Sequence, residues 1–326
     1  MKKTIKALVF ILVFAILLRC VSDLFTAEAK AGDNMSTMKR DYVVADLARQ
    51  PSDQVDVLVL GDSESYCSFS PAQLYYQTGI TSYVAGQSSQ KMNEAQSLFL
   101  EALETQKPKV VLLETNELFR PSASFDHMMS MLGDFFQRVF PVFRYHILWE
   151  KHFLSNRVSE VRWKGFDARK AVIGCDDLSD YMKADKRKEK MPAQNLHILE
   201  EIQKICDQEG IQLVLYTCPS PKNATMAKHN RVQAVADQLH IPYIDLNLPD
   251  QNLTMDWGQD TSDAGDHTNI YGAMKVTKWL GSYLTNMGLK DHRSDSAYAS
   301  WDKFATVFFQ TIGTSYLSRV EACGVS

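Results

Sequence analysis

Five short and almost entirely apolar runs recur along the chain, and they constrain its fold more than any other feature. The clearest run is residues 55–60, Val-Asp-Val-Leu-Val-Leu, which is β-rich and apolar on both faces, as expected for a strand buried in a parallel sheet. Similar strands are predicted at 82–85, 110–114, 212–217 and 242–246, with helical patterns between most of them at 71–77, 90–106, 194–209, 224–239 and 270–287. This alternation predicts an α/β fold with a doubly wound parallel sheet of about five strands.

The N-terminus carries three lysines followed by an uninterrupted apolar run from Ala7 to Leu18. Residues 5–25, with Arg19 reaching toward the membrane surface, supply the roughly 20 residues that span a bilayer. We expect a signal anchor over residues 1–28 with its N-terminus in the cytoplasm, because positively charged flanks stay inside. The remaining chain would then be extracytoplasmic. A small-x-small motif at 27–29 lies about ten residues past the run, so a cleaved signal peptide remains the alternative.

Composition excludes several classes of protein. Hydrophobic residues make up 45% and charged residues 23% of the chain, which indicates a globular protein and not a disordered one. The formal net charge of −4 argues against binding of nucleic acid. Six cysteines are too few for a disulfide-built scaffold, and the sequence contains no CxxC, HExxH or paired Cys/His cluster. We therefore expect neither a metal nor a cofactor.

The sequence predicts four regions along the chain, of which the signal anchor over residues 1–28 is the first. Residues 29–54 read as a polar stalk behind the anchor, residues 55–290 as the sheet domain, and residues 291–326 as a tail without recognisable chemistry. A long insertion over residues 117–190 interrupts the sheet domain and is expected to cap its ligand edge. Five of its aromatic residues are candidates for stacking on sugar rings, with core packing as the alternative: Phe143, Tyr145, Trp149, Trp163 and Phe166.

Gly61-Asp62-Ser63-Glu64-Ser65 stands directly after the first predicted strand and before a helix. Ligands of open α/β sheets bind outside the carboxyl ends of the strands, so the Ser63 hydroxyl is expected to project into the site. Ser63 is the candidate nucleophile. The alternative is a tight turn in which the serine only caps the helix.

A histidine precedes the last amphipathic helix, in the segment from Asp263 to Gly272. A histidine with an acid a few residues earlier can act as a general base, because the carboxylate fixes its tautomer and stabilises the imidazolium. His267 is the candidate base. Asp263 is the preferred orienting acid, since the side chain of the adjacent Asp266 is expected to diverge, and Asp260 is a third candidate. The alternative is a surface histidine beside a helix start.

Two further residues follow predicted strands and supply donors for a developing oxyanion. Gly86 follows the second strand and Asn116 follows the third. The backbone N–H groups of Gly86 and Ser63 and the side-chain amide of Asn116 are expected to converge on one carbonyl oxygen. The predicted oxyanion hole is therefore Ser63, Gly86 and Asn116.

Taken in the order Ser, Gly, Asn and His at successive strand ends, these residues resemble the SGNH/GDSL hydrolase superfamily over most of residues 55–287. The resemblance implies a flavodoxin-like sheet, nucleophile Ser63, oxyanion donors Gly86 and Asn116, and base His267. The chain departs from the family pattern in two places. Glu64 stands where the family has leucine, and Asp263 lies four residues before the histidine instead of three, which leaves the triad acid open among the three aspartates.

A narrower resemblance rests on the N-terminal anchor and on three phrases of the sequence, at 79–87, 106–111 and 266–272. With these features the chain looks like a membrane-anchored bacterial branch, similar to the envelope proteins that assist alginate acetylation and teichoic-acid D-alanylation. Such proteins often work beside a membrane-bound O-acyltransferase, which the resemblance implies as a partner.

These observations favour an extracytoplasmic serine esterase or acyltransferase that acts on O-acyl esters of cell-envelope glycans through an acyl-enzyme on Ser63. Its substrate would be an ester-bearing glycan or a small acyl ester. The alternative is a catalytically inactive scaffold of the same fold that binds a polysaccharide or a membrane acyltransferase.

Overall fold

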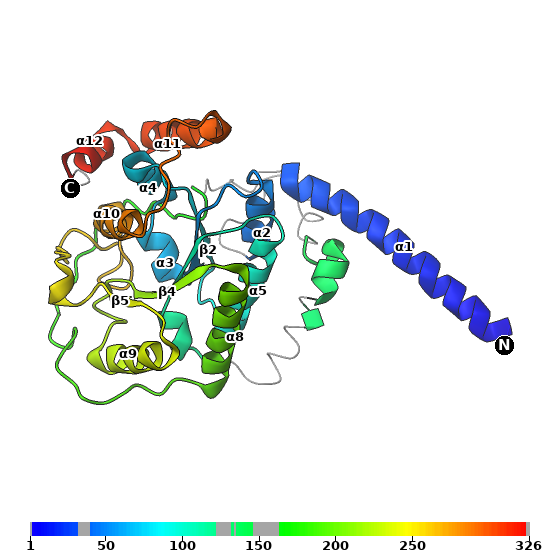
Figure 1. Ribbon diagram of the computed structural model, residues 1–326, viewed down its shortest axis with the longest axis horizontal. Coiled ribbons are helices and arrows are strands. Elements are labelled where there is room, and N and C mark those ends of the chain that lie inside the picture. The colour runs from blue at the N-terminus through cyan, green and yellow to red at the C-terminus, as the bar shows by residue number, and fades with distance from the viewer. Residues whose placement is uncertain (1, 32–39, 122–131, 134, 146–162, 324–326) are drawn as a thin grey trace. The chain divides into compact units, whose positions relative to one another are not determined.

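The computed structural model describes residues 2–31, 40–121, 132–133, 135–145 and 163–323 (Figure 1). The chain divides into two compact units. The anchor unit comprises Met1–Arg49 and Ser122–Val161, and the sheet unit comprises Gln50–Pro121 and Arg162–Ser326. The predicted insertion is thus shared between the two units, while the tail belongs to the sheet unit.

The sheet unit is built on five parallel strands in the order β2-β1-β3-β4-β5. Their bounds are β1 (Val57–Gly61), β2 (Ser82–Gly86), β3 (Val110–Glu114), β4 (Gln212–Thr217) and β5 (Tyr243–Asp245). Every residue of β1, β2 and β3 is buried, because helices cover both faces of these apolar strands. The predicted doubly wound sheet of about five strands is confirmed.

The strand order reverses beside β1, which pairs with β2 on one side and with β3 on the other. Leu60 lies opposite Leu113, and Gly61 lies opposite Gly86, so the carboxyl ends of the three strands meet at one edge. In doubly wound sheets the crevice at such a reversal is where ligands bind. The segments that follow β1, β2 and β3 are therefore the segments to search for a site.

Helices form a layer on each face of the sheet (Figure 1). Their bounds are α3 (Ser63–Ser68), α4 (Pro71–Thr78), α5 (Met92–Leu103), α8 (Ala193–Glu209), α9 (Met226–Leu239) and α10 (Ile270–Asn286). Helices α3 and α4 each contact α10, and α5 contacts α8. Asn269 fixes the start of α10, since its side-chain oxygen accepts hydrogen bonds from the N–H groups of Tyr271 and Gly272.

The tail forms two helices that the sequence did not predict, α11 (Ala299–Ile312) and α12 (Thr314–Cys323). Helix α11 packs on α4, and its Phe308 is fully buried against Trp163, Phe166 and Tyr316. Trp163 and Phe166 are therefore core residues, as the core-packing alternative expects, and they are not available to stack on a sugar ring. The tail completes the hydrophobic core of the sheet unit.

The anchor unit contains α1 (Lys2–Ala31), α2 (Arg40–Arg49) and a 3-10 turn, η2 (Pro141–Phe143). Over Lys2–Ala27, α1 is long and apolar enough to cross a membrane, with a mean hydropathy of 2.5; a signal sequence would meet the same criteria. Tyr145 is buried in a small cluster with α2, which excludes it as a sugar contact, and Trp149 lies outside the described residues.

Replacing Phe308 with alanine tests how far the tail stabilises the sheet unit. Removal of a buried phenylalanine leaves a cavity, so we expect F308A to lower the free energy of unfolding by about 3 to 5 kcal/mol. Its neighbour Val307 is 42% exposed, and V307A should change that free energy by less than about 0.5 kcal/mol. Urea unfolding of the full chain measures both values, and equal effects of the two substitutions would contradict the role of the tail.

Candidate active site

His267 and Asp263 form a hydrogen-bonded pair in the loop before α10. Asp263 Oδ2 lies 2.6 Å from His267 Nδ1, and Asp263 Oδ1 accepts a hydrogen bond from the His267 backbone N–H at 2.7 Å. Ala264 and Gly265 between them both have positive φ angles, 59° and 94°, which turn the chain so that Asp263 reaches back to the ring. This geometry accounts for the four-residue spacing and orients Nδ1 toward the acid. Nε2 is therefore the ring nitrogen that Asp263 does not engage.

The other two candidate acids are less well placed for this histidine. Asp266 Oδ2 lies 3.6 Å from His267 Nδ1, and its Oδ1 accepts a hydrogen bond from Asn223. Asp260 lies 2.5 Å from Lys275 Nζ and accepts the backbone N–H of Asp256. Of the three aspartates, Asp263 is thus the one positioned to orient the imidazole.

Asp263, Asp266 and His267 also have ligand atoms within 4.8 Å of one another, the spacing of a small metal site. Two bonds of about 2.1 Å to one Zn²⁺ hold the ligand atoms more than about 3 Å apart. The 2.6 Å contact between His267 and Asp263 is shorter than that, and it is a direct hydrogen bond. The arrangement therefore suits an acid–base pair better than a metal centre.

Arg169 also contacts the acid. Its Nη1 lies 3.4 Å from Asp263 Oδ2, and its Nε donates to Asp167 Oδ2 at 2.9 Å. The backbone N–H of Asp167 in turn donates to the carbonyl of Tyr66 in α3. The acid is thus tied to the helix that begins at Ser63.

Ser63 is the first residue of α3, immediately after the end of β1. The helix cap is Asp62, whose side chain accepts the backbone N–H of Glu64 at 2.9 Å, so the capping role considered for Ser63 belongs to its neighbour. Among the residues that the structure describes, Ser63 Oγ has no hydrogen-bond partner, and neither has His267 Nε2. The two groups are therefore uncommitted, but they are not hydrogen-bonded to each other.

Asn223 links the segment of Ser63 to the segment of His267. Its side-chain amide donates to Glu64 Oε1 at 2.5 Å and to Asp266 Oδ1 at 2.7 Å, so it bridges the direct neighbours of the candidate nucleophile and base. The Thr268 hydroxyl makes a second link, donating to the carbonyl of Cys67 in α3 at 2.9 Å. Residues some two hundred positions apart in the sequence are thus brought together at one edge of the sheet.

Gly86 ends β2 opposite Gly61, as the oxyanion prediction requires. A Cβ atom at Gly86 would lie only 2.7 Å from the carbonyl oxygen of Gly61, so glycine is the residue that this close approach of the two backbones allows.

Asn116 begins a 3-10 turn, η1 (Asn116–Phe119), directly after β3. Its Nδ2 donates to Asp62 Oδ2 at 3.1 Å, while its Oδ1 accepts from Lys228 Nζ at 3.0 Å. An ammonium group only donates and a carboxylate only accepts, so these two partners fix which way the amide points. One Nδ2 hydrogen is engaged by Asp62, and the second remains for an oxyanion. Lys228 and Asp62 thus set the orientation of the Asn116 amide, a contact that the sequence alone did not predict.

Four buried acids surround the start of α3: Asp62, Glu64, Glu114 and Glu117. Burial, followed by the charge of Asp62, raises the pKa of Glu114 to about 8. Burial, followed by the charges of Asp62 and Glu114, raises the pKa of Glu117 well above its ordinary value. Burial and the charge of Glu114 likewise raise the pKa of Glu64. Glu64, the residue that departs from the family pattern, is the one that accepts the Asn223 bridge.

A second histidine–aspartate pair lies close to these acids. His229 Nδ1 is 2.9 Å from Asp245 Oδ2, and the Tyr243 hydroxyl donates to the same oxygen at 3.2 Å. His229 and Asp245 line a small cavity of about 10 Å³ together with Glu64 and Asn116, which is room for about one water molecule. Sequence analysis did not identify this pair, because its members lie 16 residues apart on different elements.

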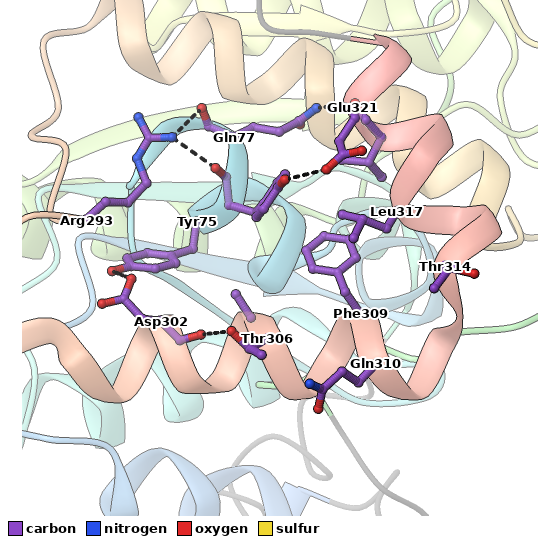
Figure 2. Close-up of a pocket in the computed structure, with 13 residues that line it drawn as sticks. Tyr75, Gln77, Arg293, Asp302, Thr306, Phe309, Gln310, Thr314, Leu317 and Glu321 are labelled. Atoms are coloured by element: carbon purple, nitrogen blue, oxygen red, sulfur yellow. Dashed lines mark hydrogen bonds between the residues drawn. The ribbon is translucent and has the colours of Figure 1, made fainter.

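Cavity size does not identify the site. One cavity among the described residues has a volume of about 950 Å³ and lies between α4, α11 and α12 (Figure 2). Figure 2 shows Tyr75 and Asp302 facing each other there, with a hydrogen bond of 2.9 Å between them. A second cavity, of about 480 Å³, lies beside α10. Neither is lined by Ser63, Asp263 or His267, so the chemistry of the strand ends, and not volume, locates the candidate site.

Comparison with known proteins finds no matching family model and no matching curated protein. Solved structures that match include a "putative acylhydrolase" from Bacteroides fragilis, at 10% identity and a TM-score of 0.39, covering 75% of this chain and 94% of that one. Another is a "putative platelet activating factor" from Streptococcus pneumonia, at 14% identity and a TM-score of 0.39, covering 86% and 98%. Both likenesses are too distant to carry an argument about activity.

The raised pKa of Glu114 predicts a specific dependence of stability on pH. Its carboxyl binds a proton in the folded chain that the unfolded chain releases, so the free energy of unfolding should fall as pH rises from about 4.5 to about 8. E114Q stays neutral, and we expect a smaller loss of Tm between about pH 5 and about pH 8.5 than in the parent chain. The exposed Glu209 supplies the matched control, E209Q, which should retain the parent slope. An unchanged slope in E114Q would contradict the burial of an acid whose pKa is raised.

Proposed function

We propose that this chain is a membrane-anchored serine esterase or acyltransferase that forms an acyl-enzyme on Ser63. The observation that carries the proposal is the 2.6 Å pair of His267 and Asp263, which Asn223 connects to the segment of Ser63 at the strand-order reversal of the sheet. An oriented histidine, an uncommitted hydroxyl and oxyanion donors are the parts that acyl transfer requires.

In the proposed reaction, His267 Nε2 accepts the proton of the Ser63 hydroxyl while Ser63 Oγ attacks the ester carbonyl. Asp263 stabilises the imidazolium that forms. The negative charge that develops on the carbonyl oxygen is met by the N–H groups of Gly86 and Ser63 and by the free Nδ2 hydrogen of Asn116. The imidazolium then returns the proton to the leaving alcohol, and a water or a sugar hydroxyl resolves the acyl-enzyme in the same way.

The absence of a Ser63–His267 hydrogen bond in the described residues is compatible with this mechanism. Catalytic hydrogen bonds are often long or misaligned without substrate and tighten in the complex. Rotation about the χ1 angle of a serine at the start of a short helix moves its Oγ by a few ångströms without moving the backbone.

For the substrate, we propose O-acyl esters of cell-envelope glycans. The support is the N-terminal helix, which is long and apolar enough to cross a membrane, together with the sequence resemblance to envelope acylation proteins. Under this proposal the sheet unit lies outside the cell membrane, and a membrane-bound O-acyltransferase is the proposed partner. Hydrolysis and transfer share the acyl-enzyme and differ only in its acceptor. An acyl ester supplied with and without a glycan acceptor separates them, because only a transferase moves the acyl group to the glycan.

One observation favours the alternative of an inactive scaffold. Among the described residues, the Ser63 hydroxyl is not hydrogen-bonded to His267 or to another base, so the same residues would also suit a protein that binds glycans without reacting.

A fluorophosphonate probe tests the proposal, since it reacts only with an activated serine. We expect the probe to label the full chain at Ser63, S63A to abolish labelling, and H267A to slow it by at least about a hundredfold. Mass spectrometry of the labelled peptide identifies the modified residue.

Two matched controls come from the same region. Ser65 lies two residues away, but its hydroxyl is buried and donates to the Asp62 carbonyl at 2.7 Å, so S65A should retain labelling. His229 is the other histidine paired with an aspartate, and H229A should retain labelling as well. No labelling of folded wild-type protein would favour the scaffold, and loss of labelling in H229A but not in H267A would move the base to the second pair.

A further inference from the structure

The anchor unit exposes large apolar side chains on two separate elements. One is α1, where Leu12 is 61% and Phe10 is 70% exposed. The other consists of residues 132–133 and 135–143, named the segment 132–143 for short, which is helical over residues 135–139 and ends in η2. Its exposed apolar residues, between 46 and 59% accessible, are Leu132, Phe135, Phe136 and Phe143. Clusters of this kind on a protein surface mark an interaction site.

Polar contacts hold the segment 132–143 against α1 at a defined level. Arg19 Nη1 donates to the carbonyl of Val139 at 3.0 Å, and the Val142 N–H donates to Ser22 Oγ at 3.2 Å. Ser22 and Val142 are both buried by this contact. The segment is therefore attached to the turn of α1 that runs from Arg19 to Ser22.

That turn lies near one end of the apolar part of α1. Residues 5–25 rise by about 30 Å along a helix axis, which matches the hydrocarbon thickness of a bilayer, and Arg19 lies about 9 Å before the end of this stretch. Arg19 also pairs with Asp23 at 3.2 Å. Charged groups of membrane helices gather near the interface and are paired when they enter the membrane. If α1 spans the bilayer, the segment 132–143 thus lies at the depth where headgroups meet acyl chains.

The chemistry of the segment suits this depth. The carbonyl of Val139, at the end of the helical turn, has no intrahelical partner and would be costly in lipid, but Arg19 satisfies it. The aromatic rings contact one another in pairs, Phe135 with Phe136 and Phe140 with Phe143, and form an apolar surface. Short amphipathic segments with aromatic side chains are typical of the membrane interface.

We propose that residues 132–133 and 135–143 form a second membrane contact of this protein, lying in the interface beside α1 with Leu132, Phe135, Phe136 and Phe143 in lipid. The inference rests on the membrane-anchored part of the proposed function and not on its chemistry. Two contacts on one unit would fix the orientation of that unit on the bilayer, which a single helix does not do.

Spin labels on the full chain in vesicles of phosphatidylcholine and phosphatidylglycerol test the proposal. Cys20, Cys175 and Cys323 are first replaced with serine, and single cysteines are then introduced at Phe136 and at Leu132. Leu12→Cys serves as the lipid reference, and Lys188→Cys, in an exposed charged stretch, serves as the water reference. The readout is the collision rate of each nitroxide with oxygen, which concentrates in lipid, relative to that with a water-soluble nickel chelate.

We expect the oxygen-to-nickel ratio at Phe136 and Leu132 to resemble that at Leu12 and to exceed that at Lys188 by about fivefold or more. A ratio at Phe136 equal to that at Lys188, with Leu12 in lipid, would overturn the proposal and leave the anchor intact. Shielding of Phe136 from both reagents would also overturn it, because protein and not lipid would then cover this surface. Fluorophosphonate labelling of Ser63 is independent of all these outcomes, so failure here is distinguishable from failure of the proposed chemistry.

Discussion

The buried carboxylate of Asp62 connects the strand ends on which the candidate site depends. One of its oxygens accepts the N–H of Glu64 and starts α3, which places Ser63 at the end of β1. The other accepts from Asn116, at the end of β3, and pairs with Arg120. Asp62 has no exposed surface, so its charge must be compensated inside the protein.

Three further acids are buried around Asp62, and their pKa values are raised. Glu64, Glu114 and Glu117 are buried beside it, and burial together with neighbouring acidic charges raises the pKa of each. Groups with shifted pKa values gather at functional sites more often than elsewhere. Ionisation of these buried acids at neutral pH lowers the free energy of unfolding. A protein retains such a destabilising arrangement where it serves another purpose.

Sequence analysis predicted the sheet because its signal is local: short apolar strands and amphipathic helices each carry their own periodicity. Ser63, Gly86 and Asn116 could also be placed at strand ends, because each stands within three residues of the end of a predicted strand. The contacts that decide the site are not local. The Asn223 side chain bridges Glu64, 159 residues earlier in the chain, and Asp266, 43 residues later. No periodicity of the sequence predicts such a contact.

The packing of the tail, and the choice between core packing and sugar stacking for Trp163 and Phe166, could not be predicted from the sequence for a related reason. Aromatic residues that bind sugars at a surface and aromatic residues that pack a core are of the same residue types, so the sequence alone does not distinguish them. Trp163 and Phe166 meet Phe308, a partner about 140 residues later in the chain, and only the fold reveals that pairing. By contrast, the hydrogen bond between Asp263 and His267 lies within one turn, and the preference for Asp263 over Asp266 and Asp260 agrees with the geometry.

The central claim is that Ser63, His267 and the strand ends act on one carbonyl group. A crystal structure of the protein with phenylboronic acid, which mimics the tetrahedral intermediate, tests it most directly. The account predicts boron bonded to Ser63 Oγ, one boronate oxygen about 3 Å from the Gly86 N–H and Asn116 Nδ2, and His267 Nε2 beside the adduct. An unmodified Ser63, or an adduct whose oxygens face away from Gly86 and Asn116, would contradict it.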